Sequence, residues 1–457
     1  MTDLSAPDAP TADAPTPDTP APDTRILDSR ALDDLPLDAL TKGIPAAAGR
    51  LRLGEVGAQG WNVLAEDLPL PVAVLKDSAL AHNGRWMARF LEAGGAVIAP
   101  HGKTTMAPQL FARQLAEGAW AITVATVQQL EVCRRFGVRR VVLANQLVGR
   151  QAIRAVLDAL AADPGFEVLC LVDSLENVAQ LEAAVAARDL GRPLNVLLEG
   201  GVAGGRTGCR DRESALAVAR AVRAAPHLAL AGVEGFEGLI QAGTPEAREA
   251  AVAVFLDFLA ELAEACDAEG LFERSPVLLS AGGSTFHDLV VKRFGRVGLG
   301  RPTQVLTRSG CYVTHDSGTY IEAFERLAAR SPELAAVAEP LQPALEVWSY
   351  VQSRPERGKA ILGFGKRDAG IDAGLPLPQA WHRPGRQDGP QPLPPGHRIL
   401  GLHDQHAEMA VPEDSPLAVG DLVACGISHP CTTFDKWRVL FTVDEAYGVT
   451  GAVATFF

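Results

Sequence analysis

The sequence lacks several features that would each point to a particular class of protein. Its 457 residues contain no run of 18 or more apolar residues, so we expect no membrane-spanning helix. The seven cysteines are odd in number and form no Cys-x-x-Cys pair, a pattern that favours a reducing cytosol over a disulfide framework. The net charge is −13 and there is no basic stripe, which argues against nucleic acid as a partner.

Charge and composition set the N-terminal region apart from the rest. The first 40 residues hold nine aspartates against Arg25 and Arg30, a net charge of −7. Residues 1–23 are almost entirely Ala, Pro, Asp and Thr and cannot bury enough apolar surface to offset chain entropy, so we predict a disordered acidic tail. The segment has neither the basic start nor the apolar stretch of a secretory signal, and we expect a cytoplasmic protein.

Short apolar runs alternate with amphipathic stretches from about residue 70 to 310. Strands that are apolar on both faces and alternate with helices indicate a parallel α/β sheet, and eight such units predict a closed (β/α)8 TIM barrel. Nine runs are present, so one must belong elsewhere, and we choose the first. The runs are Val72–Leu75, Ala96–Ala99, Trp120–Val124, Val141–Ala144, Val168–Val172, Val196–Leu198, Leu228–Val233, Val277–Leu279 and Gln304–Leu306.

The pattern changes after Tyr320. A predicted helix, Glu322–Arg330, precedes strand-like runs, and the proline-rich stretch from Gly374 to Gly396 is expected to be a loop. We therefore predict a barrel over residues 70–315 and a mostly β C-terminal domain over 316–457, with residues 24–69 packed on the β domain. The strand-like runs are Ala344–Val351, Lys359–Gly363, Leu417–Cys425 and Trp437–Val443.

Lys103 stands where a buried strand ends, in "PHGKTT", behind a proline and a glycine. The loops that follow barrel strands share one face, where active sites are built. A lysine held there can form a Schiff base with a carbonyl compound, although its position alone is equally compatible with a structural or surface lysine.

Two glycine-rich segments follow other predicted strands. In "LSAGGSTFHD" the backbone N–H groups of Gly282, Gly283 and Ser284, with the hydroxyls of Ser284 and Thr285, form either a phosphate-binding nest or a plain turn. "EGGVAGGRTG" is similar to a P-loop, but Arg206 stands where a P-loop needs lysine, so we set that interpretation aside. Arg206 instead suits a phenolate or carboxylate oxygen.

A histidine and a cysteine near the C-terminus are spaced as metal ligands. His429 and Cys431 are two residues apart, so on an extended segment their side chains face the same way. A thiolate with an imidazole suits Zn²⁺, although such pairs also arise by coincidence. His406, in "HDQHAEM", either joins them as a ligand, base or orienting partner or is an ordinary polar histidine.

Together these segments resemble the D-threonine aldolase and eukaryotic-type D-serine dehydratase family of alanine racemase-like, fold-type III pyridoxal phosphate enzymes. "PHGKTTMAP" is similar to the family's pyridoxal phosphate lysine motif, and the resemblance runs from about Leu70 to Lys436. It implies a barrel that binds pyridoxal phosphate and a β domain that holds one metal ion, Zn²⁺ or else Mn²⁺ or another divalent metal. Catalysis is expected of Lys103 and His406, cofactor binding of Lys103, Arg206, Gly282, Gly283, Ser284 and Thr285, and metal binding of His429 and Cys431.

The activity follows from the same resemblance. Dehydratases of the family carry His-x-Cys, as here, whereas threonine aldolases carry His-x-Asp. We therefore expect a pyridoxal phosphate- and zinc-dependent dehydratase that removes water from a D-3-hydroxy amino acid, such as D-serine or D-threonine, to give a 2-oxo acid and ammonia. The alternatives are a D-3-hydroxy amino acid aldolase and, more weakly, a racemase or a non-catalytic pyridoxal phosphate carrier. A homodimer is implied as well.

The sequence departs from the family pattern at three places. "EGGVAGGRTG" lacks the usual acidic residue and Thr-Gly before its arginine, Phe236 replaces a common tyrosine, and Asp404-Gln405-His406 stands where a Glu-Glu-His-like segment is expected. These differences leave the substrate open.

Overall fold

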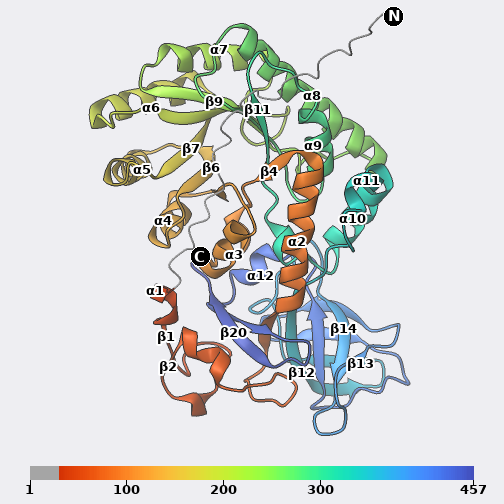
Figure 1. Ribbon diagram of the computed structural model, residues 1–457. Helices are drawn as coiled ribbons and strands as arrows, with labels where there is room; N and C mark the ends of the chain where they lie inside the picture. The colour runs from red at the N-terminus through yellow and green to blue at the C-terminus, as the bar shows by residue number, and fades with distance from the viewer. Residues whose placement is uncertain (1–29) are drawn as a thin grey trace, which may run out of the picture.

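Eight parallel strands curl into one sheet in the computed structural model, which describes residues 30–457 (Figure 1). The outermost strands meet through backbone hydrogen bonds from Trp120 to Ile98 (2.8 Å) and from Thr123 to Pro100 (2.9 Å). This arrangement confirms the predicted TIM-barrel-like fold. Along the sheet the strands are β4 (Ala96–Ile98), β11 (Thr303–Thr307), β10 (Val277–Ser280), β9 (Leu228–Gly235), β8 (Leu194–Gly200), β7 (Glu167–Val172), β6 (Arg140–Gln146) and β5 (Ile122–Val124).

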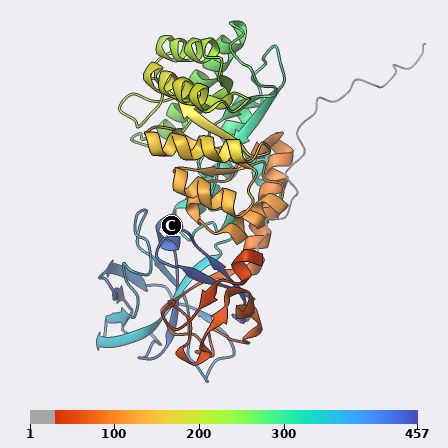
Figure 2. The same ribbon diagram turned by 90° about the vertical axis from the view of Figure 1, so that its left-hand side faces the viewer.

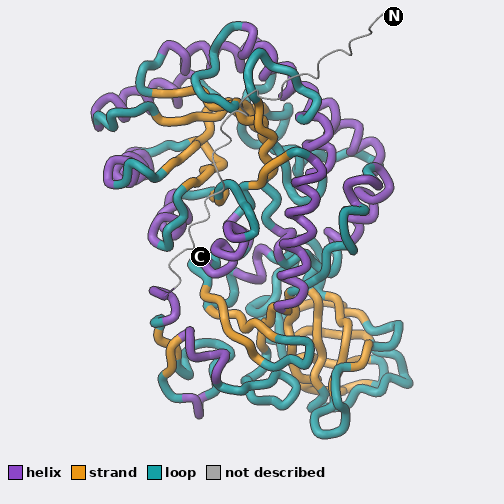
Figure 3. Tube along the Cα trace, in the orientation of Figure 1, coloured by secondary structure: helices purple, strands orange, loops and turns teal. Residues whose placement is uncertain are grey.

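Helices surround the sheet on its outer side (Figure 3). The inner face is filled by its own apolar cluster, which includes Val142, Leu169, Leu197 and Leu278. Because both faces are buried, each strand has a continuous apolar sequence, which is why the runs predict the strands. The helices are α2 (Asp77–Gly94), α3 (Pro108–Ala116), α4 (Val127–Arg135), α5 (Arg150–Ala162), α6 (Leu175–Arg188), α7 (Arg212–Ala224), α8 (Pro245–Ala268) and α9 (His287–Phe294).

A second, largely antiparallel domain lies below the barrel in Figures 1 and 2. The first apolar run forms β3 (Val72–Lys76), which pairs with β12 and β19 of this domain and not with the barrel. The run in excess of eight is therefore the first one, as we expected, and residues 72–76 are a strand of the second domain and not of the barrel. Before the domain come α10 (Thr319–Arg330) and α11 (Pro332–Ala335), and its elements are β12 (Leu345–Glu356), β13 (Lys359–Leu362), β14 (Leu377–His382), β15 (Gln391–Pro392), β16 (Arg398–Leu402), β17 (Ala407–Ala410), β18 (Leu422–Gly426), α12 (Cys431–Phe434), β19 (Val439–Val443) and β20 (Val449–Ala454).

The proline-rich stretch from Gly374 to Gly396 is not simply a loop, and that prediction was wrong. It contains β14, which pairs antiparallel with β18, and β15 at the edge of the sheet. Pro378 lies beside an irregularity in the register between β14 and β18. Proline is tolerated in a strand at such a place because it has no N–H to donate.

The described part of the N-terminal segment, residues 30–69, lies against the second domain. The Lys42 ammonium is 2.5 Å from the Asp368 carboxylate and 3.5 Å from the centre of the Trp437 ring. The Asn62 amide donates to the Ala446 carbonyl (2.9 Å). Residues 1–23, for which we predicted disorder, lie outside the described residues. The segment contains α1 (Arg30–Asp33), β1 (Pro36–Leu37), β2 (Leu51–Arg52) and the 3-10 turns η1 (Ala46–Ala48) and η2 (Leu53–Ala58).

Within residues 30–457, none of the helices combines the length and the apolar character that a membrane crossing requires.

Candidate active site

A cavity of about 360 Å³ lies at the carboxyl ends of the barrel strands. Its walls come from the end of β6, from the loops after β4, β5, β8, β9, β10 and β11, from the start of α10, and from the segment before and at the start of α12. The loops of the barrel face and of the second domain therefore meet in one space. The cavity is lined by several predicted site residues, namely Lys103, Arg206, Gly282, Gly283, Ser284, His429 and Cys431, and by others that include His101, Thr104, Asn145, Glu234, Phe236, Arg308, Cys311 and Tyr320.

Lys103 is mounted on a tight turn between β4 and α3. The turn is the 3-10 segment η3 (Gly102–Thr104), closed by a bond from the Thr104 N–H to the His101 carbonyl (3.1 Å). A Cβ on Gly102 would lie only 2.9 Å from the Ile122 and Phe111 side chains, so only glycine fits there. Thr104 is buried while Lys103 is exposed to the cavity. The sequence around the lysine thus fixes its backbone and leaves its amine free.

Positive groups dominate this part of the cavity wall. Burial, with the charges of Lys103 and Arg308, holds the pKa of His101 well below its usual value, so its imidazole is neutral at pH 7. Its Nδ1 atom is buried without a hydrogen-bond partner. Arg308 pairs with the buried Glu234 carboxylate and donates to the Ser280 hydroxyl (2.8 Å). The arrangement suits a ligand that is anionic or rich in acceptors.

The glycine-rich loop after β10 differs from the expected phosphate nest. The N–H groups of Gly282 and Gly283 donate to the carboxylate of Glu237, at 2.9 and 2.8 Å. Glu237 is fully buried, and burial raises its pKa. Two of the three N–H groups assigned to a phosphate are therefore already bonded within the protein, and the Ser284 backbone and hydroxyl remain at the cavity. Thr285 does not line the cavity; its carbonyl accepts from Arg330 (2.9 Å).

Arg206 lies on the loop between β8 and α7, with its guanidinium carbon 4.9 Å from the centre of the Phe236 ring. A second carboxylate anchors this loop: the Thr207 hydroxyl donates to Glu199 (2.8 Å), and Gln146 donates to the other oxygen of the same group. Burial, together with the neighbouring Glu234 charge, raises the pKa of Glu199 to about 7. The loop that carries Arg206 is thus held by a carboxyl group that titrates near neutrality.

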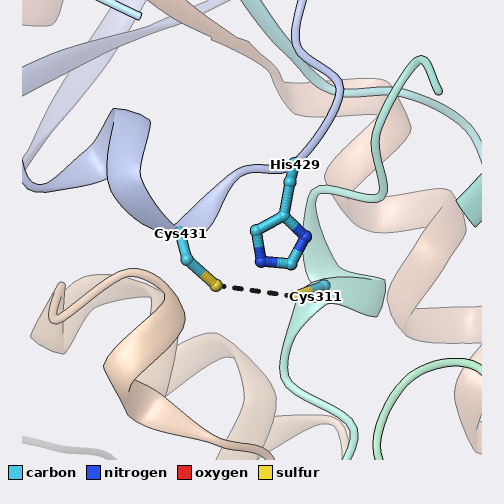
Figure 4. A group of neighbouring side chains, drawn as sticks. All are labelled: Cys311, His429 and Cys431. Carbon is cyan, nitrogen blue, oxygen red and sulfur yellow. Dashed lines mark hydrogen bonds between the residues drawn. The ribbon is translucent and has the colours of Figure 1, made fainter. Parts of the chain in front are cut away.

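The sulfur and nitrogen donors of three residues meet at the side of the cavity formed by the second domain (Figure 4). His429 and Cys431 come from the segment before and at the start of α12, and Cys311 from the 3-10 turn η4 (Cys311–Val313) after β11. Their donor atoms all lie within 4.8 Å of one another, and the two Sγ atoms are 3.8 Å apart. The hydrogen bond from the Cys431 thiol, with the His429 charge, lowers the pKa of Cys311, and the same contact raises that of Cys431. Sequence reasoning missed Cys311, because a lone cysteine after the last barrel strand carries no spacing signal.

His406, of which we expected a catalytic role, is brought neither to this cluster nor to the cavity. It is exposed on the turn between β16 and β17, where its carbonyl accepts from the His403 N–H (2.8 Å). It does not line the cavity. The "HDQH" stretch is the turn of a hairpin between β16 and β17. Polar residues are common in such turns, so they need no catalytic role to explain them.

Comparison with protein families matches two consecutive parts of the chain. Residues 76–292 match the family described as "Alanine racemase, N-terminal domain", and residues 344–443 the one described as "Putative serine dehydratase domain". A 3-hydroxy-D-aspartate aldolase from Paracoccus denitrificans (strain Pd 1222) is 27% identical over 320 residues, 68% of this chain and 76% of that protein. A D-threonine aldolase from Arthrobacter sp. is 29% identical over 184 residues. The aligned part is 40% of this chain and 47% of the aldolase, less than half of its length.

Solved structures share the two-domain fold. The D-threonine aldolase from Filomicrobium marinum has a TM-score of 0.69 and 22% identity, covering 87% of this chain and 97% of that one. The D-threo-3-hydroxyaspartate dehydratase from Delftia sp. HT23 has a TM-score of 0.66 and 22% identity, covering 86% and 99%. The resemblance stated from the sequence is thereby confirmed: two parts of the chain match an alanine racemase N-terminal domain and a serine dehydratase domain, and the chain is related to fold-type III pyridoxal phosphate enzymes that act on D-amino acids.

Proposed function

We propose that this chain is a pyridoxal phosphate- and zinc-dependent lyase that eliminates water from a D-3-hydroxy amino acid, leaving a 2-oxo acid and ammonia. One observation carries the proposal: Lys103 lines the same cavity as His429 and Cys431, although they belong to different domains. A reactive amine beside a soft metal-binding pair is what this elimination needs. A homodimer is part of the proposal on the strength of the sequence resemblance, and a cytoplasmic location on the strength of the cysteine pattern.

The residues around the cavity fit pyridoxal phosphate. A volume of about 360 Å³ lies within the usual range for pockets that hold small molecules, about 300–1,000 Å³. Neither Lys103 nor Arg206 takes part in a salt bridge among residues 30–457, so both cations are available to the anionic cofactor. Lys103 would hold its aldehyde carbon, Ser284 its phosphate and Arg206 its phenolic oxygen, and the unpartnered Nδ1 of His101 offers another polar contact.

The chemistry divides among the residues as follows. When bound, pyridoxal phosphate supplies an electron sink for the bond that breaks at the substrate Cα. The Nζ atom of Lys103 takes the Cα proton. His429 and Cys431 would hold the metal, which would supply the Lewis acidity that makes the β-hydroxyl a better leaving group. The neutral His101 next to Lys103 adds no positive charge to this part of the cavity wall.

Retro-aldol cleavage is the second candidate, because the curated relatives are named aldolases. In that reaction a base removes the β-hydroxyl proton and the Cα–Cβ bond breaks, yielding glycine and an aldehyde from D-threonine. Both reactions use the same residues and differ in the bond that breaks. Cys431 at the second metal position favours elimination, since the resemblance associates His-x-Cys with dehydratases.

Product analysis tests the proposal. Purified protein loaded with pyridoxal phosphate is incubated with D-serine and with D-threonine, with added zinc and after chelation, and the products are identified. We expect 2-oxo acid and ammonia in equal amounts, loss of this activity on chelation and recovery with zinc. Glycine with aldehyde would replace the dehydratase assignment by the aldolase one. Activity that is unchanged by the chelator would contradict the metal site. Absence of turnover with both substrates under all conditions would contradict both the dehydratase and the aldolase assignment.

A further inference from the structure

Cys311 belongs to the barrel, whereas the two predicted metal ligands belong to the second domain. It follows β11, the eighth strand of the barrel sheet, and its side chain is buried. Its Sγ atom nevertheless lies 3.8 Å from that of Cys431, and the His429 ring reaches the same point (Figure 4). Three donors from two domains thus converge on one small volume beside the proposed cofactor site.

The spacing of the two sulfur atoms matches that of ligands on one tetrahedral zinc ion. With Zn–S bonds of about 2.3 Å, two thiolates of a tetrahedral site are about 3.8 Å apart. The observed separation is 3.8 Å. No Asp or Glu belongs to the donor cluster among the described residues, so the oxygen ligands that Mg²⁺ and Mn²⁺ prefer are missing from it.

We propose that Cys311 is the third protein ligand of the metal, so that Cys311, His429 and Cys431 form a Cys2His zinc centre with one position left open. The inference rests on the proposed metal-dependent function and goes beyond it, since the two-residue motif alone neither requires a third ligand nor selects the metal. Three protein ligands with an open fourth position are the usual arrangement of catalytic zinc. The open position is where a substrate hydroxyl can bind.

The centre has two further properties in consequence. Two thiolates make the site soft, so it should take up zinc in preference to Mn²⁺ or Mg²⁺. Because all three ligands come from this chain, zinc should bind in the absence of pyridoxal phosphate and substrate. Thr104 supports the same centre, because its hydroxyl is 3.7 Å from Cys311 Sγ and 3.6 Å from Cys431 Sγ.

X-ray absorption spectroscopy at the zinc edge tests the inference on the unmodified protein, purified under reducing conditions and without pyridoxal phosphate. We expect two sulfur scatterers per zinc at about 2.3 Å. A single sulfur, with the remaining scatterers nitrogen or oxygen, would overturn the inference while leaving the proposed function intact. Failure of the protein to bind zinc at all would contradict both.

Variants give an independent test. Cys311→Ser and Cys431→Ser should each lower the zinc affinity, measured by competition with a chromophoric chelator, at least about a hundredfold, because each removes a direct ligand. Cys209→Ser is the matched control, since that thiol is buried too but donates to the Asp173 carbonyl (3.4 Å), away from the cluster. A Cys311→Ser protein that keeps wild-type zinc affinity and the wild-type sulfur count would also refute the inference. If this variant does not fold, the spectrum of the unmodified protein decides alone.

Discussion

The hydroxyl of Thr104 lies 3.6 Å from the sulfur of Cys431, although the two residues are 327 positions apart in the sequence. Thr104 directly follows Lys103 on the same 3-10 turn. One turn therefore exposes an amine to the cavity and directs a hydroxyl towards the thiols. The proposed Schiff-base lysine and the proposed metal centre are thereby coupled through the backbone of two adjacent residues.

Replacing Thr104 by valine should weaken metal binding without preventing attachment of the cofactor. Groups that hydrogen-bond to metal ligands typically contribute about 10–100-fold to metal affinity, and valine keeps the shape of threonine without its hydroxyl. We expect a loss of zinc affinity of about that size, measured by chelator competition, with the visible absorption of the cofactor retained. Thr303→Val, at the other end of the barrel in β11, is the control and should leave zinc binding unchanged. An unaltered zinc affinity in Thr104→Val would show that the hydroxyl does not support the metal.

Lys103→Ala should abolish the visible absorption that a lysine Schiff base gives, together with activity. The Lys103 amine is the only group on the turn Gly102–Thr104 that can form a Schiff base with the aldehyde, and loss of a catalytic base costs about 10²–10⁴-fold in rate. Absorption spectra of the protein mixed with pyridoxal phosphate, before and after borohydride reduction, provide the measurement. Lys366→Ala, an exposed lysine of the second domain, is the matched control. A persisting band in Lys103→Ala would place the Schiff base on another residue.

Glu237→Gln should loosen the glycine-rich loop and weaken cofactor binding. The carboxylate accepts from both Gly282 and Gly283, whereas an amide offers a single acceptor atom and leaves one buried N–H unpaired. Such an unpaired group costs about 1–3 kcal/mol, so we expect the Kd for pyridoxal phosphate, measured by fluorescence quenching, to rise about tenfold or more. Glu176→Gln, an exposed residue at the start of α6, controls for the change in charge. Equal affinity in both variants would mean that the loop does not depend on Glu237.

The strands and seven of the residues that line the cavity were predictable because their signals are local. Each barrel strand is an apolar run, and Lys103 and Arg206 follow such runs within a few residues, so the shared barrel face brings them together. Cys311 was not predictable, since its significance depends on a cysteine 120 positions later that packs against it only through the docking of two domains. The role of the Glu237 carboxylate was not predictable either, because the N–H groups that donate to it are 45 and 46 residues away in the sequence.

Glu199 makes the stability of the fold depend on pH near neutrality. Burial raises its pKa from 4.5 to about 7, so between these values the native protein holds a proton that the unfolded chain releases. Stability should therefore fall as the pH rises from about 4.5 to 7, by up to about 3 kcal/mol for this one group, since each pKa unit corresponds to about 1.4 kcal/mol. Glu199→Gln removes the titration and keeps both hydrogen bonds, because the Gln146 amide can turn to accept from the new NH2 group. We expect chemical denaturation to give similar stabilities for the two proteins at pH 5 and a more stable variant at pH 8. Parallel stability curves over this range would show that Glu199 ionises in the native protein as readily as in the unfolded chain, and that its burial in the barrel does not govern its charge.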